Sequence, residues 1–273
     1  MKIQRKLLWL LVVTTCLTGI SQFTHATIQT TKPYQQMTLP ERGAFVSEQA
    51  RRLARQISGR DYQFTPAFEA EIQKAVEFYA RRIGNNGGDQ LSKGDGRLIF
   101  ERGQTVASTL IRIFKARDVS PLIGLYIPLI ESEYVNLQAP NSVGAIGMFQ
   151  FLPKTGEHYG LSAAELLDVE KSADAAARYI AAGLKTFEED PMKEALALLA
   201  YNRGAGNVES DLATLVNQQN RGCSICALTE HRDKLDPPFQ SENVYYVPRF
   251  FAAAIVGENP KAFGLQTQPL SSF

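Results

Sequence analysis

The stretch that most constrains this chain is an apolar run that ends in a carboxylate. Residues 121–131 read PLIGLYIPLIE, and Glu131 is the only charged side chain among them. If the run is a helix, it is apolar on all sides, and such a helix is buried. Burial disfavours the charged form of a carboxyl group, so we expect the pKa of Glu131 to be raised. Glu131 is therefore a candidate general acid, able to donate a proton to a glycosidic oxygen near neutral pH.

A proline inside the same run also favours a functional site. Pro128 lies in the middle of the expected helix, where a proline removes a backbone hydrogen bond. Departures from local preference of this kind are more common at functional sites than elsewhere. A structural alternative stays open, in which Glu131 caps a buried helix end or pairs with an arginine, since structural ion pairs also perturb pKa values.

The N-terminus has the pattern of a secretion signal. A basic start precedes the apolar run 7–13, and the small-residue pattern Thr24-His25-Ala26 follows it. The run is too short to span a bilayer. Lipid attachment at Cys16 is not favoured, because no Gly, Ala or Ser directly precedes this cysteine. We predict that residues 1–26 are a signal peptide and that the protein is exported to the periplasm.

Charge and cysteine content exclude several function classes. Without residues 1–26 the chain has 26 basic and 28 acidic residues, which argues against nucleic acid as a partner. Cys223 and Cys226 remain, and in an exported protein we predict a disulfide that closes a small surface loop. Two histidines are too few to complete a zinc site with these cysteines. We therefore predict no metal and no cofactor.

Helical periodicity dominates the rest of the chain. Apolar residues recur at helical spacing, no stretch shows sustained period-two alternation, and no repeat of 20–50 residues is present. The protein is predicted to be all-α or nearly so, with further helices in the ranges 68–83, 99–117, 173–187, 192–201 and 247–256.

A second carboxylate, which most glycosidases use beside the acid, is not evident. Glu133 is two residues from Glu131, and positions i and i+2 of a helix do not face each other. Asp168, Glu170 and Glu209 are further candidates that the sequence does not place. If Glu131 works alone, the nucleophile comes from the substrate. One group that acts first as acid and then as base suits attack by a hydroxyl of the sugar itself.

Several short motifs follow one another in a distinctive order. They are Glu131-Ser132, Gly144-Ala145-x-Gly147-x-x-Gln150, Ala200-Tyr201-Asn202 and Tyr246-Val247-Pro248. In this order they resemble the peptidoglycan lytic transglycosylases with a soluble-transglycosylase, goose-lysozyme-like catalytic domain. The proline three residues before Glu131, the Tyr159-Gly160-Leu161 stretch and the late Tyr246-Val247-Pro248 are most similar to the membrane-bound D-type branch. The resemblance covers residues 68–265.

The resemblance implies a lysozyme-like helical domain and a non-hydrolytic reaction. The β-1,4 bond between N-acetylmuramic acid and N-acetylglucosamine is cleaved and a 1,6-anhydro end is left. Glu131 would protonate the leaving oxygen and then take the proton of the muramoyl C6 hydroxyl. Two alternatives stay open: a lysozyme that activates water with a second carboxylate, and a non-catalytic glycan-binding or assembly protein.

The same resemblance implies a set of substrate contacts. Gln150 and Asn202 would hold sugar or N-acetyl groups, Tyr201 would brace Glu131 or the acetamido group, and Met148 with its neighbour Phe149 would offer an apolar wall. Each has a structural alternative, as a satisfied loop residue, a helix cap or core. Asn141 competes with Ser142 for the loop serine position of the family, and we favour Ser142. The candidate substrate-binding residues are Ser142, Met148, Gln150, Tyr201, Asn202 and Tyr246.

The motifs also suggest the partners of the protein and how the chain is organised. We expect it to bind the glycan strands of peptidoglycan and to be a monomer in solution. A cell-envelope or secretion complex stays open as a recruiting partner. The predicted segments are a signal peptide (1–26), an N-terminal tether with a short helix (27–65), an N-terminal helical region that packs on the catalytic domain (66–118), the lytic transglycosylase catalytic domain (119–265) and a C-terminal tail (266–273).

Overall fold

The computed structural model describes residues 32–215 and 222–273. The predicted signal peptide, with Cys16, lies outside the described residues, and so does the start of the 27–65 segment. The described ranges contain eleven α-helices and no β-strand, only an isolated bridge between Ile146 and Phe151. The all-α prediction is confirmed. No helix in these ranges is long and apolar enough to cross a membrane.

The helices expected from periodicity are present. They are α2 (Pro66–Arg82), α3 (Gly96–Lys115), α4 (Pro121–Ser132), α6 (Val169–Thr186), α7 (Lys193–Arg203) and α11 (Tyr246–Glu258). Four helices that the periodicity did not predict are α5 (Pro153–His158), α8 (Ala205–Thr214), α9 (Ser224–Glu230) and α10 (Pro237–Ser241). Short 3₁₀ segments cover Tyr34–Gln36, Glu165–Leu167, Arg232–Lys234, Asn243–Tyr245, Pro260–Phe263 and Leu270–Ser272.

Helix α1 (Leu39–Ser58) corrects the short helix expected in the 27–65 segment, because it is 20 residues long. Thr38 caps its first turn, and the Glu41 side chain accepts a hydrogen bond from the Thr38 backbone at 2.6 Å. Pro40 lies in that first turn, where a proline is tolerated, so it opens the helix and does not mark a tether. One face of the helix is buried through Phe45, Val46, Ala50, Leu53 and Ala54.

The cysteine pair is bonded, but its position corrects the predicted surface loop. Cys223 and Cys226 form a disulfide, and both are buried. The Cys223 sulfur accepts a hydrogen bond from the Cys226 backbone N–H at the start of α9. The Cys226 sulfur accepts one from the backbone N–H of Thr65, which caps α2. The disulfide therefore belongs to the core between α9 and α2, since Ile225 and its neighbours are buried with it.

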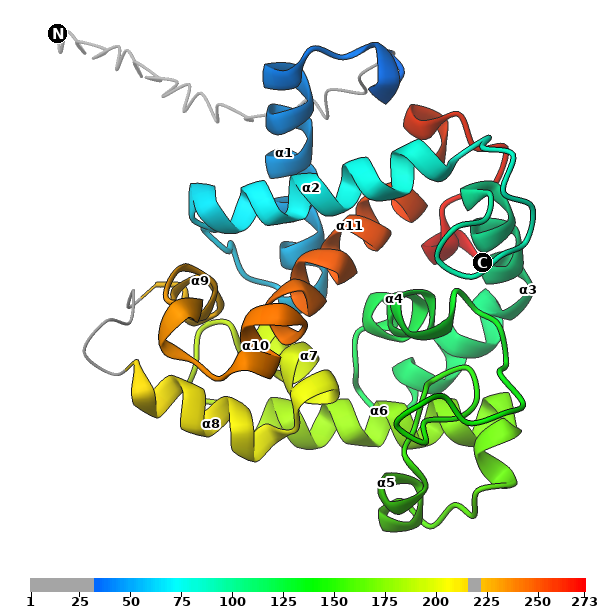
Figure 1. The fold of residues 1–273 in the computed structure, drawn as a ribbon, viewed down its shortest axis with the longest axis vertical. Helices are drawn as coiled ribbons and strands as arrows, with labels where there is room; N and C mark the ends of the chain where they lie inside the picture. Colours follow the sequence, from blue (N-terminus) through cyan, green and yellow to red (C-terminus); the bar gives the residue numbers. More distant parts are fainter. Residues whose placement is uncertain (1–31, 216–221) are drawn as a thin grey trace, which may run out of the picture. The chain divides into compact units, whose positions relative to one another are not determined.

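Helix α4 is held between α3 and α11 (Figure 1). A Cβ atom at Gly124 of α4 would overlap the Phe114 ring of α3, and one at Gly257 of α11 would overlap the Tyr126 hydroxyl of α4. The same hydroxyl donates to Glu258 at 2.6 Å. Both contacts depend on glycine because only glycine lets the two helices approach so closely. Packing on two sides therefore fixes the helix that carries Glu131.

Substitution Gly124→Ala tests this close packing. The added methyl group overlaps the Phe114 ring, and overpacking of this kind costs about 1–3 kcal/mol. We expect a lower melting temperature in thermal unfolding followed by circular dichroism. The matched control is Gly206→Ala in α8, where no atom lies within 4 Å of the added Cβ. An equal loss of stability in both variants would contradict the proposed helix contact.

Candidate active site

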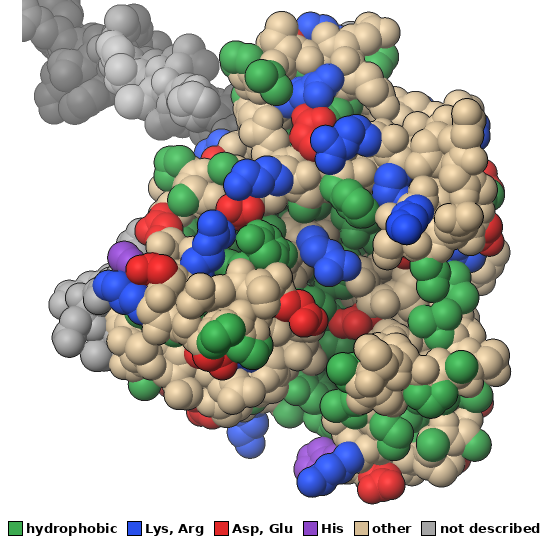
Figure 2. Space-filling model, in the orientation of Figure 1, with side chains coloured by type: hydrophobic (Ala, Val, Ile, Leu, Met, Phe, Trp, Pro, Cys, Tyr) green, Lys and Arg blue, Asp and Glu red, His purple; other side chains and the backbone are tan. Residues whose placement is uncertain are grey.

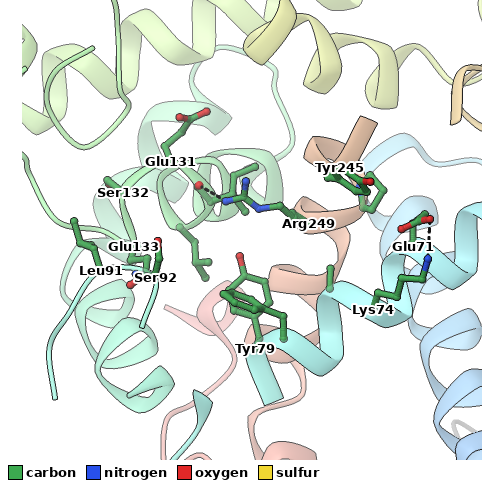
Figure 3. A pocket seen from close by; sticks show the side chains of 15 residues that line it. Glu71, Lys74, Tyr79, Leu91, Ser92, Glu131, Ser132, Glu133, Tyr245 and Arg249 are labelled. Atoms are coloured by element: carbon green, nitrogen blue, oxygen red, sulfur yellow. Dashed lines mark hydrogen bonds and ion pairs between the residues drawn. The ribbon is translucent and has the colours of Figure 1, made fainter. Parts of the chain in front are cut away.

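Glu131 lies at the C-terminal end of α4, on the edge of a groove with a volume of about 520 Å³ (Figure 3). Helices α2, α4 and α11 form its walls together with the loop residues Leu91 and Ser92. On the face of the molecule shown in Figure 2, acidic and basic side chains meet near the middle. The groove is large enough for a ligand, because ligand pockets measure about 300–1,000 Å³.

The carboxyl group of Glu131 combines burial with one strong hydrogen bond. Its pKa is raised to about 7, mainly because the group is buried, and the nearby charge of Glu242 contributes to the rise. The Tyr246 hydroxyl donates to Glu131 Oε1 at 2.6 Å and, with the charge of Arg249, opposes that rise. In the described ranges no arginine forms an ion pair with Glu131 within 4 Å, so the arginine alternative is not supported. The raised pKa keeps part of the Glu131 carboxyl groups protonated near neutral pH, where an ordinary glutamate is ionised.

The chain turns sharply directly after Glu131. Glu133 and Tyr134 both adopt positive φ angles, 52° and 61°, which L-residues rarely do. Arg82 holds the Glu133 carboxylate through two hydrogen bonds of 2.5 and 3.1 Å, and Arg102 donates to its backbone carbonyl at 2.9 Å. Figure 3 shows the side chains of Glu131 and Glu133 pointing apart. Glu133 therefore fixes the turn and is not a second carboxylate for the reaction site.

Ser132 connects the end of α4 to the Gly-rich loop. Its hydroxyl is buried and donates to the backbone carbonyl of Met148 at 2.7 Å. The Met148 side chain is buried, and Phe149 is fully buried and stacks on Phe114 of α3. The expected apolar wall for a sugar face is therefore not offered by these two side chains, because the loop folds them into the core.

The loop is further organised by the two amide side chains at its ends. Asn141 Oδ1 accepts hydrogen bonds from the backbone N–H groups of Val143 and Ala145 at 2.9 and 3.0 Å. Its Nδ2 donates to Gln150 Oε1 at 3.1 Å, and Gln150 Nε2 donates to the carbonyl of Gly147 at 2.7 Å. Ser142 is exposed and makes no hydrogen bond to another described residue. Asn141 thus builds the loop, whereas Ser142 presents its hydroxyl to solvent.

Tyr246, and not Tyr201, forms the hydrogen bond to Glu131. The Tyr201 hydroxyl donates to the carbonyl of Phe149 at 2.9 Å, so it supports the loop and does not bond to Glu131. The bond to Glu131 comes from Tyr246, which sequence analysis had placed among substrate contacts. Asn202 Oδ1 accepts a hydrogen bond from Asn243 at 2.6 Å, and its side chain is half-buried.

The other candidate carboxylates lie elsewhere. Asp168 caps α6 by accepting two backbone hydrogen bonds of 3.0 Å. Glu170 pairs with Arg112 at 2.9 Å, and Glu209 is exposed on α8. Glu242 is the exception, because its charge reaches Glu131 and raises the pKa of that carboxyl group, although no hydrogen bond joins the two. The described residues contain no group of three or more His, Cys, Asp and Glu side chains that could hold a metal ion.

Arg249 is a residue that the sequence analysis missed. It donates to the backbone carbonyl of Ile130 at 3.0 Å and lines the groove beside Glu131. Its spacing could have revealed it, since Arg249 follows Tyr246 by three residues and such positions share a helix face.

Comparison with known proteins supports the motif assignment. Residues 110–221 match the family described as Transglycosylase SLT domain. The chain is 28% identical over 150 residues to the membrane-bound lytic murein transglycosylase D of Escherichia coli K12, and equally to that of Escherichia coli O6:H1. The match covers 54% of this chain and 30% of each relative, so the chain spans less than a third of the length of these relatives.

Substitution Ser132→Ala tests how the loop is attached to α4. It leaves the buried carbonyl of Met148 without its hydrogen bond from Ser132, and we expect a loss of stability of about 1–3 kcal/mol. Hydrogen exchange should become faster at the loop amides, including that of Gly147. Ser142→Ala is the control and should leave both measurements unchanged, because Ser142 is exposed. Unchanged exchange in the Ser132 variant would contradict the attachment.

Proposed function

We propose that this chain, which carries a transglycosylase SLT domain, is a peptidoglycan lytic transglycosylase. In this proposal it cleaves the β-1,4 bond between N-acetylmuramic acid and N-acetylglucosamine without water and leaves a 1,6-anhydromuramoyl end. One observation carries the proposal. Glu131 has a pKa raised to about 7, lines a groove, and has no other carboxylate bonded to it in the described ranges.

In the first step Glu131 acts as a general acid. Its proton moves to the glycosidic oxygen as the bond between C1 and that oxygen breaks, and positive charge develops on the muramoyl ring. A general acid is most effective when its pKa lies near the working pH, and burial gives Glu131 such a pKa. The Tyr246 hydroxyl then stabilises the carboxylate that forms, because it is already hydrogen-bonded to Oε1.

In the second step the same carboxylate acts as a base. It takes the proton of the muramoyl C6 hydroxyl while O6 forms a bond to C1, which closes the anhydro ring. Glu131 regains its proton, so the two steps balance without a water molecule. No described carboxylate is hydrogen-bonded to Glu131, and Glu242 is the one whose charge reaches it. We propose the internal attack, which does not require Glu242, over a hydrolysis that needs a second carboxylate.

The remaining candidate residues are proposed to bind the glycan. The half-buried side chains of Gln150 and Asn202, and the exposed hydroxyl of Ser142, offer polar groups to sugar hydroxyls or acetamido groups. Tyr201 is proposed to act by holding the loop. We also propose residues 119–265 as the catalytic unit, with 66–118 packed on it, which the contact between α3 and α4 supports.

The cellular setting is proposed from the N-terminal sequence. Residues 1–26 would direct export to the periplasm, where the protein would act as a monomer on glycan strands. The relatives are named membrane-bound enzymes of murein, which supports a place in the cell envelope.

The proposed reaction is tested by mass spectrometry of purified sacculi digested with residues 27–273. We expect anhydro-muropeptides from the unaltered protein and from Glu242→Gln, and none from Glu131→Gln. Products with reducing ends would contradict the lyase reaction and indicate a lysozyme. No product from the unaltered protein would refute catalysis and favour a glycan-binding role.

The pH dependence of kcat/KM tests the role assigned to Tyr246. Activity should fall as the pH rises through about 7, because only the protonated form of Glu131 can donate. The hydrogen bond from Tyr246 lowers the pKa of Glu131, so Tyr246→Phe should move this alkaline limb to higher pH. Tyr201→Phe removes a hydroxyl that bonds to Phe149 and should leave the limb in place. Equal shifts in both variants would contradict the assignment.

A further inference from the structure

The groove beside Glu131 extends well beyond the reacting bond. Its far part is built by α2 and the start of α11, and neither helix lies within residues 110–221, which match the family. The Gly-rich loop, Tyr201 and Asn202 do not line it. Glu131 thus lies between the proposed glycan site and this far part of the groove, which we call the α2–α11 groove.

The α2–α11 groove exposes apolar side chains. Phe78, Leu91 and Tyr245 are 42%, 40% and 37% exposed, and they are three of the seven large hydrophobic side chains that are exposed in the described ranges. Exposed apolar groups gathered in one groove mark a binding site more often than scattered ones do.

The same groove holds a cation without an anionic partner. Arg249 reaches from α11 towards the end of α4, with Tyr79 close by in Figure 3. It forms no ion pair with another described residue, while its bond to the carbonyl of Ile130 fixes its direction. Farther along, the Glu71 carboxylate is shared by Lys74 at 3.0 Å and Arg232 at 3.4 Å. Glu133, which also lines the groove, is paired with Arg82, so among the described residues Arg249 is the lining cation without an ion-pair partner whenever Glu131 is protonated.

We propose that the α2–α11 groove binds the peptide stem of the muramoyl residue and that Arg249 pairs with a carboxylate of that peptide. This inference rests on the proposed function. The stem is attached through the lactyl ether of the same ring whose C1 bond Glu131 protonates, so it leaves the glycan next to Glu131. A guanidinium group suits carboxylate recognition because it can donate two parallel hydrogen bonds.

The charge pattern separates this occupant from additional sugar residues. N-acetylglucosamine carries no charge and would leave Arg249 unpaired, whereas a muramoyl residue without its stem offers a lactyl carboxylate but no apolar side chain. The peptide stem supplies two kinds of group that the groove can bind. They are apolar side chains for Phe78 and Leu91, and carboxylates for Arg249. Arg249 acts in this proposal as a specificity residue, and the enzyme is expected to prefer glycan that carries stems.

Binding is measured by calorimetry in the Glu131→Gln background, which prevents turnover. The two probes are a muramoyl-containing tetrasaccharide with intact peptide stems and the same tetrasaccharide with each lactyl carboxyl group capped as a methyl amide, which carries neither stem nor charge. We expect about tenfold tighter binding of the stem-bearing probe, as for one charge-assisted hydrogen bond. The preference should disappear in Arg249→Gln and shrink in Phe78→Ala, which does not touch Glu131. The control is Arg112→Gln, which removes a surface ion pair with Glu170 and should keep the preference for the stem-bearing probe.

Equal affinity for the two probes, or a preference that survives both groove substitutions, would overturn the inference. The outcome is distinguishable from failure of the proposed function. Anhydro products from sacculi together with equal affinities would refute stem binding alone, whereas a stem preference without such products would refute the lyase reaction and keep the groove assignment.

Discussion

Desolvation of one carboxyl group is the constraint on which the site depends. Glu131 ends a helix that is apolar on every side, and burial there raises its pKa to about 7. The rise needs a helix that cannot move towards solvent. Close packing at Gly124 and Gly257 supplies this, because α4 is held between α3 and α11. Packing far from the reacting atoms thus sets the proton affinity of the group proposed to react.

The polar groups around Glu131 adjust that proton affinity from a different part of the chain. Tyr246 donates to the carboxyl group and Arg249 places a positive charge near it, and both come from α11. The segment that matches the family ends at residue 221, before this helix begins. The Gly-rich loop reaches the same point through Ser132. Residues from α4 and α11, which are distant in sequence, therefore meet at the carboxyl group, and the Gly-rich loop is attached to the residue that follows Glu131.

The sequence predicted what depends on local pattern. Helical periodicity placed α4, and an apolar run ending in one carboxylate identified Glu131 and the direction of its pKa shift. Tertiary contacts were not predictable in this way. A tyrosine hydroxyl can reach either a carboxylate or a carbonyl, so only the packing of α7 and α11 shows that Tyr246 bonds to Glu131 and Tyr201 to the Phe149 carbonyl. The buried disulfide was misplaced because its polar neighbours hid Ile225.

The most direct test of this account is the pKa of the Glu131 carboxyl group itself. It can be measured by carbon-13 NMR of the protein labelled at glutamate side chains, titrated between acid and alkaline pH, with Glu131→Gln identifying the resonance. The account predicts a midpoint of about 7. A midpoint near the ordinary glutamate value of about 4.3 would contradict it, because Glu131 would then be ionised at neutral pH and could not serve as the acid.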